Sequence, residues 1–428
     1  MNVYTLTRYN DCFEALCNPH LAQSMYDAGG VVMDDVLLTL HGEAHKARRH
    51  LALRVFRRDF ARYYEREVFP KVCTDALTTL VRAGDADIVR FGQQVTMNLT
   101  ADFAGIDRPR RDAGETAALL ALVRKFGEGA TLVHSTRDHA QVRAEVRTAL
   151  AEFEREFLAA SIARRRALLD AVAAGTADDT TLPRDILTVL LRNEDRVPLP
   201  HAVLTREIAF YLQAGSHSTA NALVHTLHEL FCWCACEPAQ RARLQTDALY
   251  LQRAVHESLR LHPASPVAWR RALKPCALPD GTPVAAGDRV VLDLAAANCD
   301  TTVFGTDAHQ FNPERVITQP RAYPFGLTFG TGVHLCLGRD LDGGIAQPLA
   351  AISHARAAGT DANERAVGDV ATHDGVDADR RQLGIITCLL QGLLAAGVSP
   401  HPTSPPRHDE STQRSNWATY PVTFEPTT

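Results

Sequence analysis

The ten residues 329–338 constrain the possible fold and chemistry of this chain more than any other segment does. They read Phe-Gly-Thr-Gly-Val-His-Leu-Cys-Leu-Gly, so that an aromatic residue, three glycines and a histidine surround one cysteine. A thiolate that binds a metal needs backbone N–H groups turned toward its sulfur, and such hydrogen bonds tune the metal. Gly330 and Gly332 permit this close approach because a residue without Cβ reaches positive φ at little steric cost. The segment therefore predicts a loop that presents Cys336 as a metal ligand.

The full pattern Phe-Gly-x-Gly-x-His-x-Cys-x-Gly is more specific than its cysteine. A lone cysteine among ten would most often be an ordinary buried small residue. Six specified positions favour the metal ligand instead, and the segment resembles the signature of the cytochrome P450 family of haem-thiolate monooxygenases. The resemblance implies haem b, with its iron held by Cys336 and the porphyrin contacted by Phe329, Gly330, Gly332, His334 and Gly338.

A second resemblance lies upstream, in a helix that should end near His262 because Pro263 follows it. Glu257 and Arg260 stand three residues apart on one face of this helix, close enough to pair. At a protein surface such a pair is common and contributes little. In the family, the same Glu-x-x-Arg is buried behind the haem and is joined by an arginine from later in the chain. Arg315 follows Glu257 and Arg260 in that order and can be this third member.

Basic side chains for the haem carboxylates are also expected from the resemblance. His45 and Arg49 are four residues apart and share a helical face, so they can clamp one carboxylate. Arg270 resembles the family's strand arginine that holds the other. Its neighbour Arg271 is an alternative.

The longest apolar helix is predicted from about Val203 to Trp233, and it resembles the central helix that passes over the oxygen-binding face of the haem. Gly215 marks a place where the helix can open or bend, because the hydroxyls near it can bond back to carbonyls a turn earlier. The expected catalytic segment is Ala214, Gly215, His217, Ser218 and Thr219.

This segment departs from the family at two positions. His217 stands where an acid is usual, and Ser218 stands where threonine is usual. Serine still donates a hydrogen bond and histidine relays protons near neutral pH, so the relay is intact but retuned on one interpretation. On a second interpretation the site cleaves the O–O bond poorly. On a third, the substrate itself supplies a hydroxyl.

The expected fold is mainly α with small β-sheets, the cytochrome P450 fold with its long helix over the haem. Length alone would suggest two or three domains, but the resemblance implies one domain over residues 1–428. Val3 begins a strand that other members reach only after several dozen residues, so the N-terminus is shortened or the start codon is misassigned. A second departure follows the ligand, where residues 343–380 interrupt the expected helix and predict a loop insertion before helical pattern resumes at Gln382. This loop either touches a redox partner or is only tolerated.

The net charge of -5 argues against a nucleic-acid partner. The sequence shows no N-terminal apolar run or signal peptide, which predicts a cytoplasmic protein without a membrane anchor. One local basic cluster, either a solvated helix or a docking surface for an acidic electron donor, comprises Arg48, Arg49, Arg54, Arg57 and Arg58.

The resemblance implies a monooxygenase that inserts one oxygen atom of O2 into a small or medium organic substrate, by hydroxylation or epoxidation, in secondary or catabolic metabolism. Electrons would come from NAD(P)H through a reductase and a ferredoxin- or flavodoxin-type donor. Residues 22–40 and 126–139 are expected to select the substrate. The alternatives are the same fold catalysing oxidative coupling or another non-hydroxylating reaction, and a haem sensor without turnover.

Overall fold

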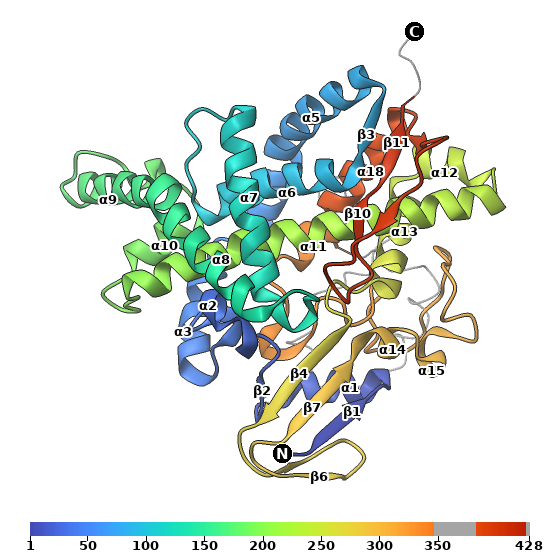
Figure 1. Cartoon of the computed structure of the whole chain (residues 1–428), viewed down its shortest axis with the longest axis horizontal. Helices are drawn as coiled ribbons and strands as arrows, with labels where there is room; N and C mark the ends of the chain where they lie inside the picture. Colours follow the sequence, from blue (N-terminus) through green and yellow to red (C-terminus); the bar gives the residue numbers. More distant parts are fainter. Residues whose placement is uncertain (346–381, 425–428) are drawn as a thin grey trace.

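The computed structural model describes residues 1–345 and 382–424. Within them the chain is mainly helical with four small sheets, which confirms the predicted fold class (Figure 1). No helix among these residues combines the length and apolar character needed to cross a bilayer.

Helix α11 (His201–Cys236) runs through the middle of the molecule (Figure 1). It confirms the helix predicted over 203–233 and is buried over most of its length because its sequence is apolar on several faces. Helix α6 (Ile88–Ala104) crosses it closely. The crossing needs small residues, since a Cβ on Gly215 would lie 2.8 Å from Cγ2 of Thr100.

The larger hydrophobic core fills the helical half around α11. Helices, 3-10 turns and two π-helical turns of this half alternate with short loops. They are α2 (Gly30–Met33), α3 (Gly42–Ala52), α4 (Arg58–Tyr63), η3 (Tyr64–Val68), α5 (Phe69–Ala83), α7 (Ala113–Ala130), η4 (Leu132–His134), α8 (His139–Phe153), η5 (Glu154–Leu158), α9 (Ala159–Ala173), η6 (Asp179–Thr181), α10 (Ile186–Arg192), α12 (Gln240–Thr246), α13 (Ala248–Leu261) and α18 (Ile385–Ala395).

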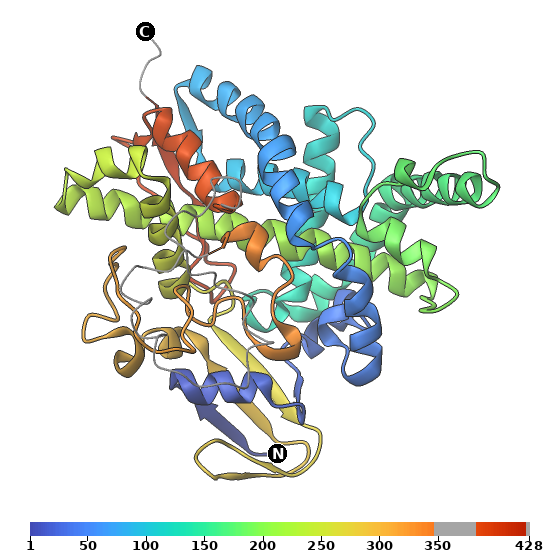
Figure 2. The same cartoon turned by 180° about the vertical axis from the view of Figure 1, so that it is seen from behind.

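The largest sheet has the strand order β1-β7-β4-β2 and covers a second, smaller core. Strand β1 (Val3–Leu6) pairs in parallel with β7 (Arg289–Asp293), which confirms the predicted N-terminal strand. Alternate residues of β7 point into this core, as expected for a strand with one buried face. Figure 2 shows the sheet on one side of α11 and the orange segment that carries Cys336 between them.

The remaining elements frame this sheet and the chain ends. They are α1 (Tyr9–Cys17), β2 (Leu21–Gln23), η1 (Asp27–Gly29), η2 (Leu37–Thr39), β3 (Asp85–Asp87), β4 (Val267–Ala272), β5 (Cys276–Ala277), β6 (Pro283–Val284), α14 (Leu294–Asn298), α15 (Thr301–Phe304), η7 (Gly332–His334), α16 (Arg339–Asp342), β8 (Ser399–Pro400), β9 (Arg407–His408), β10 (Trp417–Thr419) and β11 (Pro421–Thr423).

The helix after the ligand ends early, as predicted. Helix α16 stops at Asp342, and α18 begins at Ile385. Most of the predicted insertion, 343–380, lies outside the described residues. The described residues on either side of the undescribed part lie together, because the Ile345 N–H donates to the Gln382 carbonyl at 3.0 Å. The insertion itself stays a prediction.

Candidate metal centre and active site

A tight loop presents Cys336. Its backbone N–H donates to the Phe329 carbonyl at 2.9 Å, which closes the loop. Gly330 and Gly332 have φ of +65° and +68°, the left-handed region that the sequence predicted for them. A Cβ on Gly332 would also lie 2.9 Å from the Leu16 carbonyl oxygen, so α1 holds the loop from outside.

The Cys336 side chain is solvent-accessible although protein surrounds it deeply. A group that lines an internal space is accessible and still poorly solvated. Burial, followed by the charge of Asp342, raises the pKa of the thiol to about 11, while the Gly338 N–H and Arg49 act in the opposite direction. A bound cation deprotonates a coordinating thiol outright, so a metal at this position overcomes that barrier.

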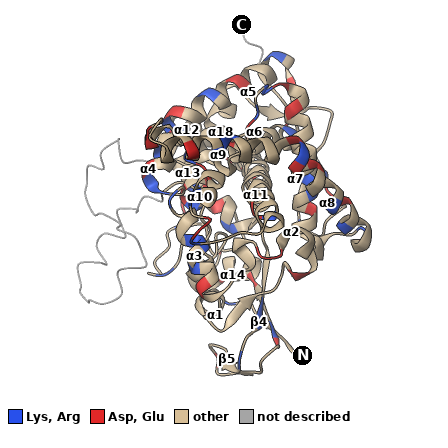
Figure 3. Ribbon diagram, turned by 90° about the vertical axis from the view of Figure 1, so that its left-hand side faces the viewer, with Lys and Arg blue, Asp and Glu red and all other residues tan. Residues whose placement is uncertain are grey.

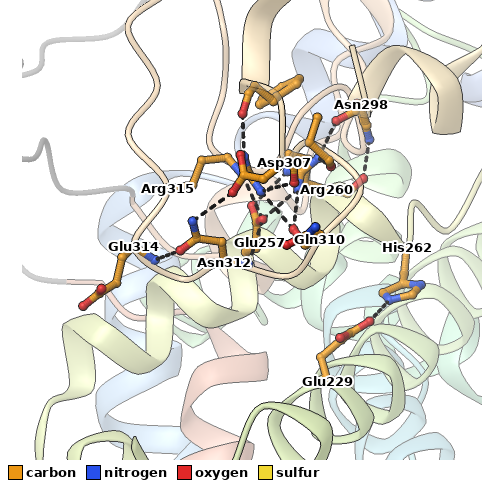
Figure 4. A network of polar contacts seen from close by, with 12 residues as sticks. Glu229, Glu257, Arg260, His262, Asn298, Asp307, Gln310, Asn312, Glu314 and Arg315 are labelled. Atoms are coloured by element: carbon orange, nitrogen blue, oxygen red, sulfur yellow. Dashed lines mark hydrogen bonds and ion pairs between the residues drawn. The ribbon is translucent and has the colours of Figure 1, made fainter. Parts of the chain in front are cut away.

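A buried ion network joins α13 to Arg315 (Figure 4). Glu257 accepts two hydrogen bonds from Arg260, at 2.8 and 2.7 Å, and a third from Arg315 at 2.9 Å. Arg260 is completely buried, so the pair is not the surface contact that its spacing also allowed. The predicted three-membered network is therefore present in the structure.

Several nitrogen donors near the loop lack acceptors. The Nε2 atoms of His41, His45 and His334 are buried, and none has a partner among the described residues. The three rings form one cluster, with centroids of His45 and His334 4.4 Å apart and those of His41 and His334 5.3 Å apart. Burial lowers the pKa of His45 to about 4 and that of His334 to about 3, so both are neutral donors. Such a cluster fits a group that brings carboxylates.

Two arginines complete this cluster. Arg270 is buried, and its hydrogen bonds go to Gln23 and to the Trp269 carbonyl rather than to a carboxylate. Arg271 is exposed and pairs with Asp27 at 2.6 Å, so the geometry favours Arg270 of the two candidates. Arg49 donates to the Leu335 carbonyl at 2.6 Å, beside Cys336. The residues present therefore fit an iron porphyrin.

The central helix is continuous through the segment 214–219. Ser218 donates to the Ala214 carbonyl at 2.7 Å and Thr219 donates to the Gly215 carbonyl at 2.8 Å, which are the expected bonds to the preceding turn. No opening of the helix is present at Gly215. This glycine instead provides the space for Thr100 of α6.

His217 differs from the expected near-neutral relay. Burial, reinforced by the charge of Arg414, lowers its pKa to about 4. Its Nε2 lies 3.2 Å from Nδ2 of Asn221. The imidazole is therefore neutral at pH 7. It can relay a proton only by accepting one on its free ring nitrogen and releasing the one on the other ring nitrogen.

Two residues of this region were not predicted from the sequence. Burial raises the pKa of the Asp342 carboxyl to about 7, and the nearby Thr219 hydroxyl opposes this shift. Arg414 acts electrostatically on His217 from the loop between β9 and β10. Neither belongs to a motif or a periodic pattern, so the sequence carries no signal for them.

The basic cluster predicted on residues 48–58 divides into two groups. Arg48 is buried and pairs with Glu207 at 3.1 Å, and Arg49 turns toward Cys336. Both were wrongly placed in a possible docking surface. Arg54, Arg57 and Arg58 are exposed and lie between the end of α3 and the first residue of α4. Figure 3 shows Lys and Arg in blue at both helices.

Comparisons with known proteins agree with this geometry. Residues 238–341 match the family model described as Cytochrome P450. The cytochrome P450 monooxygenase PikC of Streptomyces venezuelae is 32% identical over 160 residues, which cover 37% of this chain and 36% of PikC. The chain spans from 17% to 37% of the length of the first curated relatives that it matches.

Solved structures resemble the whole described fold. CalO2 aligns with a TM-score of 0.68 at 17% identity, covering 99% of this chain and 91% of CalO2. P450BioI, solved in complex with hexadec-9Z-enoic acid ligated acyl carrier protein, aligns with a TM-score of 0.69 at 17% identity and coverages of 98% and 92%. The chain thus has the fold of solved cytochrome P450 structures. The segment that matches the Cytochrome P450 family model, residues 238–341, includes the cysteine loop.

Proposed function

We propose that this protein is a haem-thiolate monooxygenase that inserts one oxygen atom of O2 into a small or medium organic substrate. The observation that carries the proposal is the Cys336 loop, closed by glycines at positive φ and placed next to a cluster of donors without acceptors. Haem b, when bound, supplies the activation of dioxygen at iron.

The residues of this chain would divide the work of holding the haem. Cys336 is the proposed axial ligand, with Phe329, Gly330, Gly332 and Gly338 shaping its loop. The proposed carboxylate donors are His45, Arg49, Arg270 and His334. We also propose His41, because its Nε2 has no partner among the described residues and its ring lies beside that of His334.

Proton supply is proposed to run along one side of α11. Ser218 and Thr219 present hydroxyls there, each held by a carbonyl of the preceding turn. The Asp342 carboxyl, on whose pKa Thr219 acts, has a pKa of about 7 and would exchange protons at neutral pH. Asp342 thereby offers a carboxyl near the helix that lacks the acid usual at position 217.

Electrons are proposed to come from NAD(P)H through a reductase and a ferredoxin- or flavodoxin-type donor. The exposed arginines Arg54, Arg57 and Arg58 would contact this acidic partner. Residues 1–428 would act as one domain in the cytoplasm.

The test is a turnover experiment with labelled dioxygen. The haem-loaded protein, a surrogate ferredoxin and its reductase are mixed with compounds that shift the spin state of the ferric iron. We expect substrate-dependent NAD(P)H consumption and one labelled oxygen atom in the product. Consumption without any oxygenated product would favour the non-hydroxylating alternative, and no consumption would favour a sensor.

A further inference from the structure

Arg414 lies in a loop close enough to α11 for its charge to act on His217. The loop joins β9 to β10 and docks on residues 134–136 through backbone hydrogen bonds. Gln413 N–H donates to the His134 carbonyl at 2.8 Å, and Thr136 N–H donates to the Ser411 carbonyl at 3.0 Å. The backbone therefore fixes where the Arg414 side chain begins.

The guanidinium of Arg414 has no hydrogen bond or ion pair to any residue that the structure describes. Its Nε and Nη2 atoms are buried without acceptors. Deep burial lowers its pKa, and the only acidic group that counteracts this shift is the phenol of Tyr26. Yet the side chain keeps some accessible surface, as expected for a group that lines an internal space.

Two other buried arginines of this chain, Arg260 and Arg165, have carboxylate partners. Arg260 meets Glu257, and Arg165 meets both Asp185 and Asp107. A buried charge without a partner costs several kcal/mol, so Arg414 would be expensive as a purely structural residue. Its burial makes sense if a ligand brings the missing anion.

The neighbours of Arg414 lie over the catalytic segment. Its charge lowers the pKa of His217 on α11 and that of His134 on η4, so it acts on both rings. The Nε2 atom of His134 is also buried without a partner. Arg414, His134 and His217 therefore offer donors to one group located beside the proposed site of oxygen insertion.

We propose that Arg414 binds a carboxylate of the substrate, so that the substrate of this enzyme is an organic acid. The inference rests on the proposed function, since it assigns the substrate class of that same site. A haem carboxylate is the other source of this chemistry. We assign those carboxylates to the donor cluster of His45, His334 and Arg270. Arg414 shares the neighbour Tyr26 with Arg270 but acts on His217 and His134 instead.

The test is a binding titration of the haem-loaded protein with matched pairs of probes. The probes are straight-chain and aryl-substituted alkanoic acids of medium length, each paired with its primary amide. We expect acids to shift the iron spin state and amides of the same shape to bind far more weakly. Arg414→Gln should weaken acid binding about 10- to 100-fold, because a charge-assisted contact is lost, and leave amide binding nearly unchanged.

Arg407→Gln is the control, since Arg407 is exposed on the same hairpin. It should leave acid binding unchanged. Thermal unfolding of each protein with and without the acids gives a second readout that does not depend on the iron. Equal binding of acids and amides, no binding of any acid, or loss of haem from Arg414→Gln would each overturn the proposal. Failure of the proposed function would appear separately, as a protein without a thiolate-type spectrum before any acid is added.

Discussion

Arg260 and Asn298 hold each other by reciprocal hydrogen bonds. Arg260 Nη1 donates to the Asn298 carbonyl at 2.6 Å, and Asn298 Nδ2 donates to the Arg260 carbonyl at 2.9 Å. Asn298 Oδ1 also accepts the Leu327 N–H at 2.6 Å. The ion network on α13 is thus connected to the segment just before Phe329, and it positions the cysteine loop rather than only stabilising the core.

Glu257→Gln should destabilise the protein strongly. The substitution leaves the buried charges of Arg260 and Arg315 without their carboxylate, and such a loss costs about 3–5 kcal/mol. Urea unfolding of the purified protein measures this change. Because the loop depends on the network, the variant should also retain less haem.

Glu314→Gln is the matched control for this experiment. Glu314 pairs with Arg243 at 2.6 Å, but both side chains are exposed, so the expected loss is below about 1 kcal/mol. Equal stability losses in the two variants would contradict the role given to the buried network.

Ser218→Ala should lower the fraction of consumed electrons that appear in product. The hydroxyl lies on α11 in the proposed relay, and its removal leaves one donor fewer for the oxygen chemistry. The measurement compares NAD(P)H consumed with product formed. Ser216→Ala removes a hydroxyl two residues away that bonds only to the Leu212 carbonyl and should leave coupling intact. Unchanged coupling in Ser218→Ala would remove this residue from the relay.

Stability should fall as pH decreases from about 6.5 to about 4, and His256 should contribute to this loss. Burial lowers its pKa to about 4, although its hydrogen bond to the Gly343 carbonyl at 2.7 Å opposes the shift. As the pH falls, His256 binds a proton in the unfolded chain before it does so in the folded protein. Its contribution to the free energy of unfolding is therefore fully present above pH 6.5 and amounts to about 3 kcal/mol by linkage.

Replacing His256 by Gln keeps a donor for Gly343 but removes the titration. The free energy of unfolding should therefore depend less on pH between 7 and 4.5 in His256→Gln than in the parent protein. His309→Gln, at an exposed histidine, should leave the dependence as it was. A parent and a His256→Gln variant with superimposable pH profiles would show that His256 does not titrate as described.

Charge reversal at Arg54 and Arg57 should slow reduction by a ferredoxin and flatten the salt dependence of its rate. Both side chains are exposed, and surface charges accelerate association at low ionic strength. Stopped-flow reduction at several salt concentrations measures the effect. Reversal at Arg147 and Arg155, exposed on α8 and η5, changes net charge equally and should have a smaller effect.

The sequence predicted the parts of the site that depend on local rules. Glycine conformations determine the cysteine loop, and the length of the apolar run determines the helix over 203–233. Helical periodicity brings Glu257 and Arg260 together. Each of these rules acts over a few neighbouring residues, so it can be read directly from the order of amino acids.

Other features depend on how distant segments meet. The neutral state of His217 follows from burial against α7 and from Arg414, which is almost 200 residues later in the chain. The inward turn of Arg48 depends on Glu207 of α11. Gly215 suggested a bend, but in the structure it leaves room for Thr100 of α6. The sequence of α11 alone does not show that α6 packs there.

The central claim is that the Cys336 sulfur is the axial ligand of a haem iron. The most direct measurement is the absorption spectrum of the reduced, haem-loaded protein under carbon monoxide. We predict the strongly red-shifted Soret band of an adduct with an axial thiolate, and its replacement by a nitrogen-ligand spectrum in Cys336→His. A nitrogen-ligand spectrum in the parent protein, or a protein that stays colourless when haem is offered, would contradict the account.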